Sequence, residues 1–229
     1  METLVYVIPI GVSWITSFVV GRFLLPLTSK EEKLSKPEAK GLAFTVGVMM
    51  GLFAVLGLAS YSTAPIERLP LLVAVVTLLL VVILILISEH YFLLAPHLRP
   101  VAFIFAGIPL AIFRAGEVAA AASTAGLVAP LVLIPIGVSV AGGLVNQFEG
   151  YGDLVMAIIA IAALSGIAAS EGEFPALVVL LAGSGAILPF SLGHRPAKVL
   201  IGDIGTFGIG ALIATAAILG RFEIAACIV

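Results

Sequence analysis

Asp203 is the residue of this sequence whose surroundings point most directly to chemistry. It follows two basic residues, Arg195 and Lys198, and lies between Gly202 and Gly205 at the start of an apolar stretch. A carboxylate at the end of a membrane span is costly unless it meets water, a cation or a metal. Basic side chains suit phosphate, and glycines let the backbone approach a ligand closely. The segment therefore predicts either a phosphate and cation site or a charge that merely reaches toward water from a helix end.

The composition of the chain indicates a membrane protein. Of its 229 residues, 62% are hydrophobic and only 10% are charged, and the mean hydropathy is +1.27. A soluble domain of this size carries far more polar surface. The net charge of -2 gives no reason to expect a nucleic-acid partner. Cys227 is the only cysteine, which excludes a disulfide within the chain.

We expect the apolar stretches to form about eight transmembrane helices, because a helix needs about 20 apolar residues to cross a bilayer. The predicted fold class is an all-α polytopic helical bundle, with a single domain over residues 1–229. The first stretch lacks the basic start and the cleavage site of a signal peptide, so we predict that it is a span. The expected spans are Leu4–Leu25, Leu42–Tyr61, Leu69–Ile87, Val101–Phe113, Ala119–Val140, Leu154–Ser170, Phe174–Leu192 and Gly205–Leu219.

The distribution of basic residues predicts the orientation of these spans. Placing the lysine-rich loop after the first span in the cytoplasm puts the N-terminus outside. The inner loops are then at about residues 26–41, 88–100, 146–153 and 193–204. Eight of the eleven Lys and Arg residues lie in or beside these loops, in agreement with the positive-inside rule, and the outer side is expected to hold only Arg68, Arg114 and Arg221. The four loops could build one cytoplasmic site, and the nearly pure apolar span centres argue against a pore.

Two of the inner loops carry ionisable residues of different kinds. Lys36 and Lys40 suit an anionic ligand or a lipid phosphate, although lysines are also common in any inner loop. Glu89 and His90 end an apolar run that should be helical, and such a pair can bind a metal or exchange protons. The alternative for this pair is an interfacial belt at the level of the lipid headgroups.

The remaining inner loops contain oxygen and backbone donors. Asn146, Glu149 and Asp153 have oxygens that suit a hard cation such as Mg²⁺, which also joins substrate phosphates. The alternative is an ordinary polar turn, since glycines lie between them. Thr206 and the first amides of the following helix would add donors for an anion. The helix dipole alone also favours Asp203 at that position.

Taken together, these loops resemble the polyprenyl-phosphate N-acetylhexosamine-1-phosphate transferase superfamily. Residues 196–206 read Pro-Ala-Lys-Val-Leu-Ile-Gly-Asp-Ile-Gly-Thr. This stretch is similar to the family signature Pro-Ala-Lys/Arg-Val-Phe-hydrophobic-Gly-Asp-x-Gly-Ser/Thr. The spacing of Asn146, Gly150 and Leu154 is similar to a second family motif, and the first inner loop also resembles its counterpart. The resemblance covers nearly the whole chain.

The resemblance implies an activity, partners and site residues. Members of the family transfer a sugar-1-phosphate from a nucleotide sugar to a polyprenyl phosphate and use Mg²⁺. For this chain it implies a UDP-sugar, a dolichyl or undecaprenyl phosphate and the lipid bilayer as partners, Mg²⁺ or Mn²⁺ as cofactor, the plasma membrane as location, and a homodimer. The implied residues are Asp203, Glu89 and His90 for catalysis, Asp203 and Asn146 for the metal, and Lys36, Lys40, Asn146, Glu149, Asp153, Arg195 and Lys198 for the substrates.

The chain departs from the family pattern in two of the loops. Glu89-His90 stands where the family has an Asp-Asp pair, and Gly152 stands where it has Asn or Asp. The family also continues beyond the Asp203 span with further helices and a loop that recognises the sugar, so residues 1–229 do not identify the donor sugar. Three functions therefore stay open: an active transferase, a non-catalytic relative that binds lipid phosphate or pairs with an active subunit, and a transporter. The transporter is the least favoured, because no inverted repeat is evident.

Overall fold

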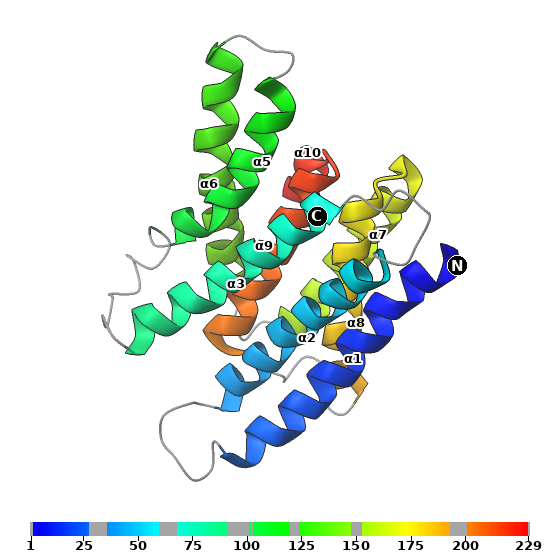
Figure 1. Ribbon diagram of the computed structural model, residues 1–229. Helices are drawn as coiled ribbons and strands as arrows, with labels where there is room; N and C mark the ends of the chain where they lie inside the picture. The colour runs from blue at the N-terminus through cyan, green and yellow to red at the C-terminus, as the bar shows by residue number, and fades with distance from the viewer. Residues whose placement is uncertain are drawn as a thin grey trace.

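The computed structural model of the chain is a helical bundle (Figure 1). It describes residues 2–27, 36–59, 68–90, 101, 103–119, 124–147, 153–192 and 201–228. Within these ranges there is no β-strand, which confirms the expected all-α class. The elements are α1 (Glu2–Leu27), α2 (Lys36–Ala59), α3 (Arg68–His90), η2 (Ile104–Gly107), α5 (Ile108–Ala119), α6 (Thr124–Gln147), α7 (Asp153–Glu171), α8 (Phe174–Leu192), α9 (Gly202–Leu219) and α10 (Glu223–Ile228).

Six of the described helices are long and apolar enough to cross a membrane, namely α1, α2, α3, α6, α8 and α9. Helix α7 is also apolar, and its 19 residues equal the length of α8. The span expected at Val101–Phe113 differs more: a 3-10 turn, η2, leads into α5, which runs beyond it and carries Arg114 and Glu117. The polytopic bundle is thus confirmed, and η2 with α5 stands where one of the about eight spans was expected.

Short turns link the helices at one end of the bundle. Gly172 has a φ of +73°, a conformation that glycine adopts without steric cost. The Glu173 amide then donates a 3.0 Å hydrogen bond to the Ala168 carbonyl oxygen, which ends α7 in a Schellman-type turn. Arg221 follows α9 with a φ of +58°. These turns make α7 and α8 direct neighbours and fold α10 back onto α9.

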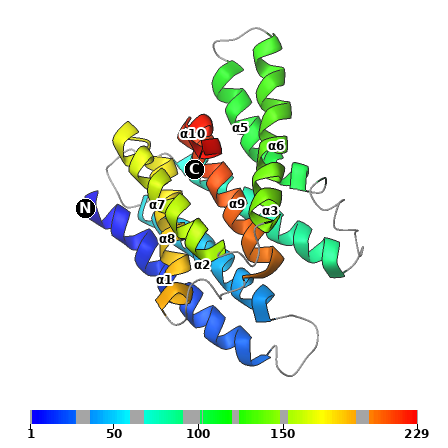
Figure 2. The same cartoon turned by 180° about the vertical axis from the view of Figure 1, so that it is seen from behind.

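Helix α9 is the central helix of the bundle (Figures 1 and 2). Its sides contact α2, α3, α6 and α8, and 83% of its spanning segment is buried. Small residues allow this close packing, since a Cβ added at Gly210 would lie 2.5 Å from the carbonyl oxygen of Ala141 on α6. The ring of Phe207 also stacks on Phe103, with 4.1 Å between their centroids. The residues that open α9 are therefore held by several helices at once.

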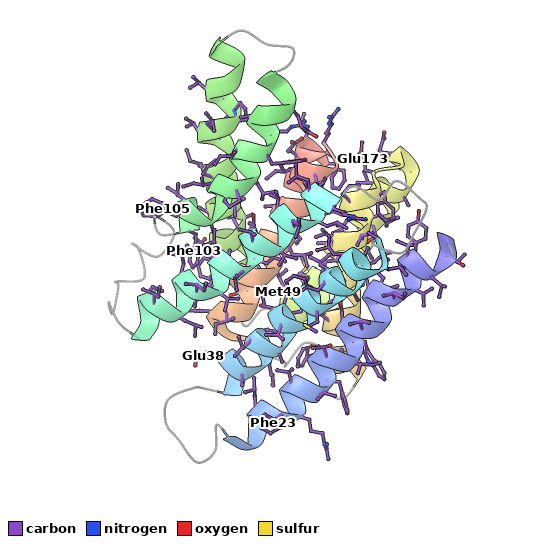
Figure 3. All side chains as sticks on the ribbon, in the orientation of Figure 1. Phe23, Glu38, Met49, Phe103, Phe105 and Glu173 are labelled. Carbon is purple, nitrogen blue, oxygen red and sulfur yellow. The ribbon has the colours of Figure 1, made fainter. Side chains whose placement is uncertain are left out.

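The path of the chain gathers particular helix ends together. One end of the bundle holds the starts of α2 and α9 and the ends of α1, α3, α6 and α8 (Figures 1 and 2). We call it the site end. Figure 3 shows Phe23 and Glu38 at the site end and Glu173 at the opposite end. At the opposite end Glu117 accepts a 2.7 Å hydrogen bond from Arg114 and lies 3.6 Å from Arg221. The basic residues that we expected on the outer side are thus separated from the site end.

A buried hydroxyl on α9 allows a test of this packing. The side chain of Thr215 is fully buried, and its hydroxyl has no hydrogen-bond partner among the described residues. An unsatisfied buried hydroxyl costs free energy, whereas valine has the same shape without the polar atom. Thr215→Val should raise the free energy of unfolding by about 1 kcal/mol, measured as a higher Tm in detergent. A lower Tm would mean that the hydroxyl is bonded and that α9 packs differently.

Candidate functional site

The candidate site lies at the site end, where the first turns of α2 and α9 meet the last turn of α6. Oγ1 of Thr206 on α9 donates a 2.7 Å hydrogen bond to Oδ1 of Asn146 on α6. On the other side of α9, Gly41 of α2 lies against Gly205. Asn146 and Thr206 are 60 residues apart in the sequence, so only the tertiary fold joins them. Residues at the edges of three of the predicted inner loops therefore meet at one place.

Asn146 belongs to a helix rather than to a loop. We expected a span to end near Val140 and a loop to begin at residue 146, but α6 continues to Gln147. This additional helical length carries the half-buried carboxamide of Asn146 to α9, while the next side chain, Gln147, is exposed. The helix therefore fixes the direction in which the Asn146 side chain leaves the backbone.

Asp203 lies in the first turn of α9 and is half-buried. The helix begins at Gly202, slightly before the expected start near Gly205. Gly202 has a φ of +69°, which favours glycine over any residue with a side chain. The free amides and the dipole of this turn favour an anion. Thr206 lies one turn further along α9, where its hydroxyl is 3.2 Å from the carbonyl oxygen of Asp203 and bonds Asn146. Asp203 and Asn146 therefore lie in the same part of the site end.

A glycine contact brings α2 against the start of α9. A Cβ added at Gly41 would overlap the backbone nitrogen of Gly205 and lie 2.5 Å from the carbonyl oxygen of Ile201. Any side chain at this position would push the two helices apart, because backbone atoms cannot turn away. Lys40 precedes Gly41 and is half-buried. The contact thus places a basic residue of α2 at the helix end that carries Asp203.

The described residues include only part of the predicted site. Asp203, Asn146 and Lys40 lie at the site end. A second group lies at helix ends with side chains outside the described residues: Lys36 in α2, Glu89 and His90 in α3, and Asp153 in α7. A third group lies wholly outside the described residues: Glu149, Arg195 and Lys198.

Two contributions at the site end were not predicted from the sequence. Thr206 was expected to donate to an anion, but its hydroxyl bonds Asn146 instead. Gly41 was assigned to a lysine loop, but it makes the contact between α2 and α9. The signal for both was the group of small residues around Asp203, since glycines at a helix start indicate close backbone approach. The sequence alone does not name the partner helix.

The described side chains offer oxygen ligands rather than a complete metal cage. In this part of the chain there is no group of three or more His, Cys, Asp and Glu residues that could hold a metal. The Asp203 carboxylate and the Asn146 amide oxygen are hard donors on neighbouring helix ends. Mg²⁺ is usually held by one or two such protein groups together with substrate phosphates and water. The arrangement therefore suits a metal that binds with a phosphate ligand.

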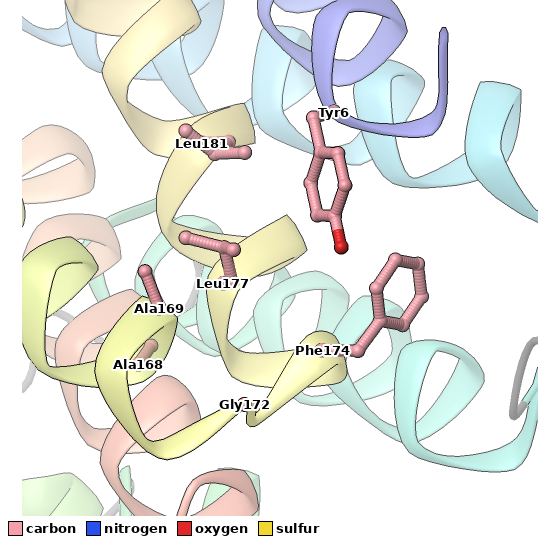
Figure 4. Close-up of a pocket in the computed structure, with 7 residues that line it drawn as sticks. All are labelled: Tyr6, Ala168, Ala169, Gly172, Phe174, Leu177 and Leu181. Atoms are coloured by element: carbon pink, nitrogen blue, oxygen red, sulfur yellow. The ribbon is translucent and has the colours of Figure 1, made fainter. Parts of the chain in front are cut away.

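An apolar groove lies at the opposite end of the bundle (Figure 4). It has a volume of about 410 Å³ and is lined by α1, α7 and α8. The rings of Tyr6 and Phe174 in its lining meet edge to face, with 5.8 Å between their centroids. Among the described residues, no charged side chain lines it. The lining residues are Tyr6, Ala168, Ala169, Gly172, Phe174, Leu177 and Leu181.

Comparison with known proteins finds similar sequences, although no family model matches the chain. The chain is 24% identical to a protein of Saccharolobus solfataricus, provisionally named a UDP-N-acetylglucosamine–dolichyl-phosphate N-acetylglucosaminephosphotransferase. This match covers 96% of the chain and 73% of the relative. Over 38% of its length the chain is 35% identical to the phospho-N-acetylmuramoyl-pentapeptide-transferase of Streptococcus equi subsp. zooepidemicus, and 33% identical to that of Streptococcus mutans. These matches span 26% of each streptococcal enzyme.

Both kinds of relative are named as transferases of phosphorylated amino sugars. The archaeal match extends over nearly the whole chain, so the similarity is not restricted to one motif. The described helices add the apolar spans that a multi-pass membrane protein needs. The chain is therefore a multi-pass membrane protein homologous to the polyprenyl-phosphate N-acetylhexosamine-1-phosphate transferases, as its motifs indicated.

Proposed function

We propose that this chain transfers a sugar-1-phosphate from a UDP-sugar to a polyprenyl phosphate, and that the site end faces the cytoplasm. The hydrogen bond between Thr206 and Asn146 carries the proposal, because it joins the two motifs on which the resemblance rests. The name of the archaeal relative suggests UDP-N-acetylglucosamine as donor and dolichyl phosphate as acceptor. The excess of Lys and Arg in the four inner loops supports the cytoplasmic assignment.

A divalent metal fits the described residues of the site. The Asp203 carboxylate and the Asn146 amide oxygen would hold it, since both are hard oxygen donors at adjoining helix ends. When bound, Mg²⁺ would neutralise charge on the diphosphate of the donor. The fixed bond from Thr206 to Asn146 keeps one of these two donors in place before any ligand arrives.

The proposed reaction is an in-line displacement at phosphorus. An oxygen of the lipid phosphate forms a bond to the sugar-bearing phosphorus of the UDP-sugar. The bond from that phosphorus to the bridging oxygen breaks, and UMP leaves with the electron pair. The phosphate charges would be met by Lys36, Lys40, Arg195 and Lys198. The remaining assigned roles are orientation of the lipid phosphate by Glu89 and His90, and contacts to the nucleotide sugar by Glu149 and Asp153.

Release of UMP tests the proposal directly. The purified chain, mixed with UDP-N-acetylglucosamine, polyprenyl phosphate and Mg²⁺, should release UMP and form a sugar linked to the lipid through a diphosphate. Chelation of the metal should stop the release, and Mn²⁺ should restore it. A full-length relative assayed beside it is the positive control. No UMP from any common UDP-sugar, under conditions where the relative is active, would contradict the proposal.

A relative that binds substrates without turnover is the second candidate. The observation that favours it is Glu89-His90 at the position of the family's Asp-Asp pair, since Glu and His differ from Asp in reach. Such a protein would be stabilised by polyprenyl phosphate or by a UDP-sugar, because a ligand that binds only the folded state raises the Tm. A raised Tm without UMP release would select this candidate over the transferase.

A further inference from the structure

Thr206 differs from another buried threonine of the bundle in what it bonds. The hydroxyl of Thr45 on α2 donates to the carbonyl oxygen of Gly41, one turn earlier in its own helix, at 3.0 Å. The side chain of Thr206 is completely buried, and its Oγ1 lies 2.7 Å from Oδ1 of Asn146 on another helix. The acceptors within its own helix, the carbonyl oxygens of Gly202 and residue 203, are both 3.2 Å away.

A threonine hydroxyl has one proton and donates it to one acceptor at a time. The contact from Thr206 to Asn146 has the usual length of an O–H···O hydrogen bond, whereas the contacts within α9 are longer than usual for this type. The geometry therefore favours donation across to α6. The Asn146 oxygen retains a second lone pair, because a carbonyl oxygen can accept two bonds.

We infer that Thr206 is a positioning residue, whose hydroxyl holds the Asn146 carboxamide so that its oxygen can bind the same divalent cation as the Asp203 carboxylate. This inference rests on the proposed function. The terminal torsion of asparagine is broad and roughly two-fold, so a half-buried amide without a partner would sample both orientations. The bond from Thr206 selects the orientation with the oxygen toward α9. Partners of this kind commonly orient the ligands of a metal.

Removing the hydroxyl tests the inference. Thr206→Val keeps the shape of the side chain, and we expect it to weaken Mn²⁺ binding to the purified chain about tenfold, as measured by electron paramagnetic resonance. Thr206→Ser restores the hydroxyl and should restore the affinity. Thr215→Val is the matched control, because Thr215 is also fully buried on α9 and has no hydrogen-bond partner among the described residues. Unchanged Mn²⁺ affinity in Thr206→Val would overturn the positioning role.

A double-mutant cycle separates positioning from a general loss of packing. If Thr206 acts through Asn146, Thr206→Val should weaken Mn²⁺ binding only in the chain that keeps Asn146. In the Asn146→Ala background the same change should have no further effect. Equal weakening in both backgrounds would assign the effect to packing and overturn the inference.

The results for metal binding and for transfer can be told apart. Mn²⁺ binding that depends on Thr206, with no UMP release, would support the positioning role and contradict the transferase. UMP release together with Mn²⁺ binding that is insensitive to Thr206→Val would contradict only the positioning role. A chain that neither binds Mn²⁺ nor releases UMP would overturn both proposals.

Discussion

Asp203→Asn should lower the rate of UMP release by more than about a hundredfold. Loss of a residue that only supports a metal ligand usually costs about 10- to 100-fold, and loss of the ligand itself should cost more. Asparagine keeps the size of the side chain but removes the negative charge that a hard cation requires. Asp203 is half-buried in the first turn of α9, where the helix dipole stabilises its charge by about 0.3–1 kcal/mol. The rate of UMP release and the Tm, measured together, separate chemistry from unfolding.

Glu223→Gln is the matched control for this prediction. Glu223 lies in the first turn of α10 and is exposed, and it follows α9 at the opposite end of the bundle. The change removes the same charge from another helix start, so it should leave UMP release unchanged. If Asp203→Asn retained activity as fully as Glu223→Gln, Asp203 would be only a favourable charge at a helix start. That result would contradict the assignment of Asp203 to the metal.

The membrane class and the grouping of helix ends could be predicted because both depend on simple patterns. A run of apolar residues fixes a span wherever it lies, and each span reverses the direction of the chain. The residues expected on the outer side, such as Arg114 and Arg221, accordingly lie together with Glu117 at one end. The motif residues Asn146 and Asp203 lie at the other end.

Burial within the bundle could not be predicted from hydropathy. Only 28% of the spanning segment of α1 is buried, compared with 83% for α9, although both are apolar enough to cross a membrane. Lipid tails and protein side chains are both apolar, so a side chain facing either one has a similar hydropathy. Glycines such as Gly205 and Gly210 mark α9 as the central helix, because they permit close contact between backbones.

The site could be predicted in its residue types but not in its contacts. The motif identified Asp203 and Asn146 as oxygen donors. The bond from Thr206 depends on α6 continuing beyond Val140 and on how α6 crosses α9, and neither follows from local sequence preference. Helix ends are the least certain part of any assignment from sequence, since one more turn costs little free energy.

Gly41→Ala should destabilise the protein and reduce transfer. The added Cβ would meet the backbone of Gly205 and Ile201 rather than a flexible side chain, so α2 must move away from α9. Overpacking of this kind costs about 1–3 kcal/mol. The same movement would shift Lys40 relative to Asp203, and small displacements of binding groups lower the rate strongly. The Tm and the rate of UMP release should therefore fall together.

Gly57→Ala distinguishes this contact from a general effect of glycine in α2. A Cβ at Gly57 would have no atom of the described residues within 4 Å, so the change should keep transfer unchanged. It should leave stability unchanged or raise it by up to about 1 kcal/mol, since alanine favours a helix more than glycine does. Equal Tm values for the two variants would mean that Gly41 does not touch α9. The junction of α2 and α9 would then not hold Lys40 at the site, and the proposed arrangement of phosphate-binding residues would be wrong.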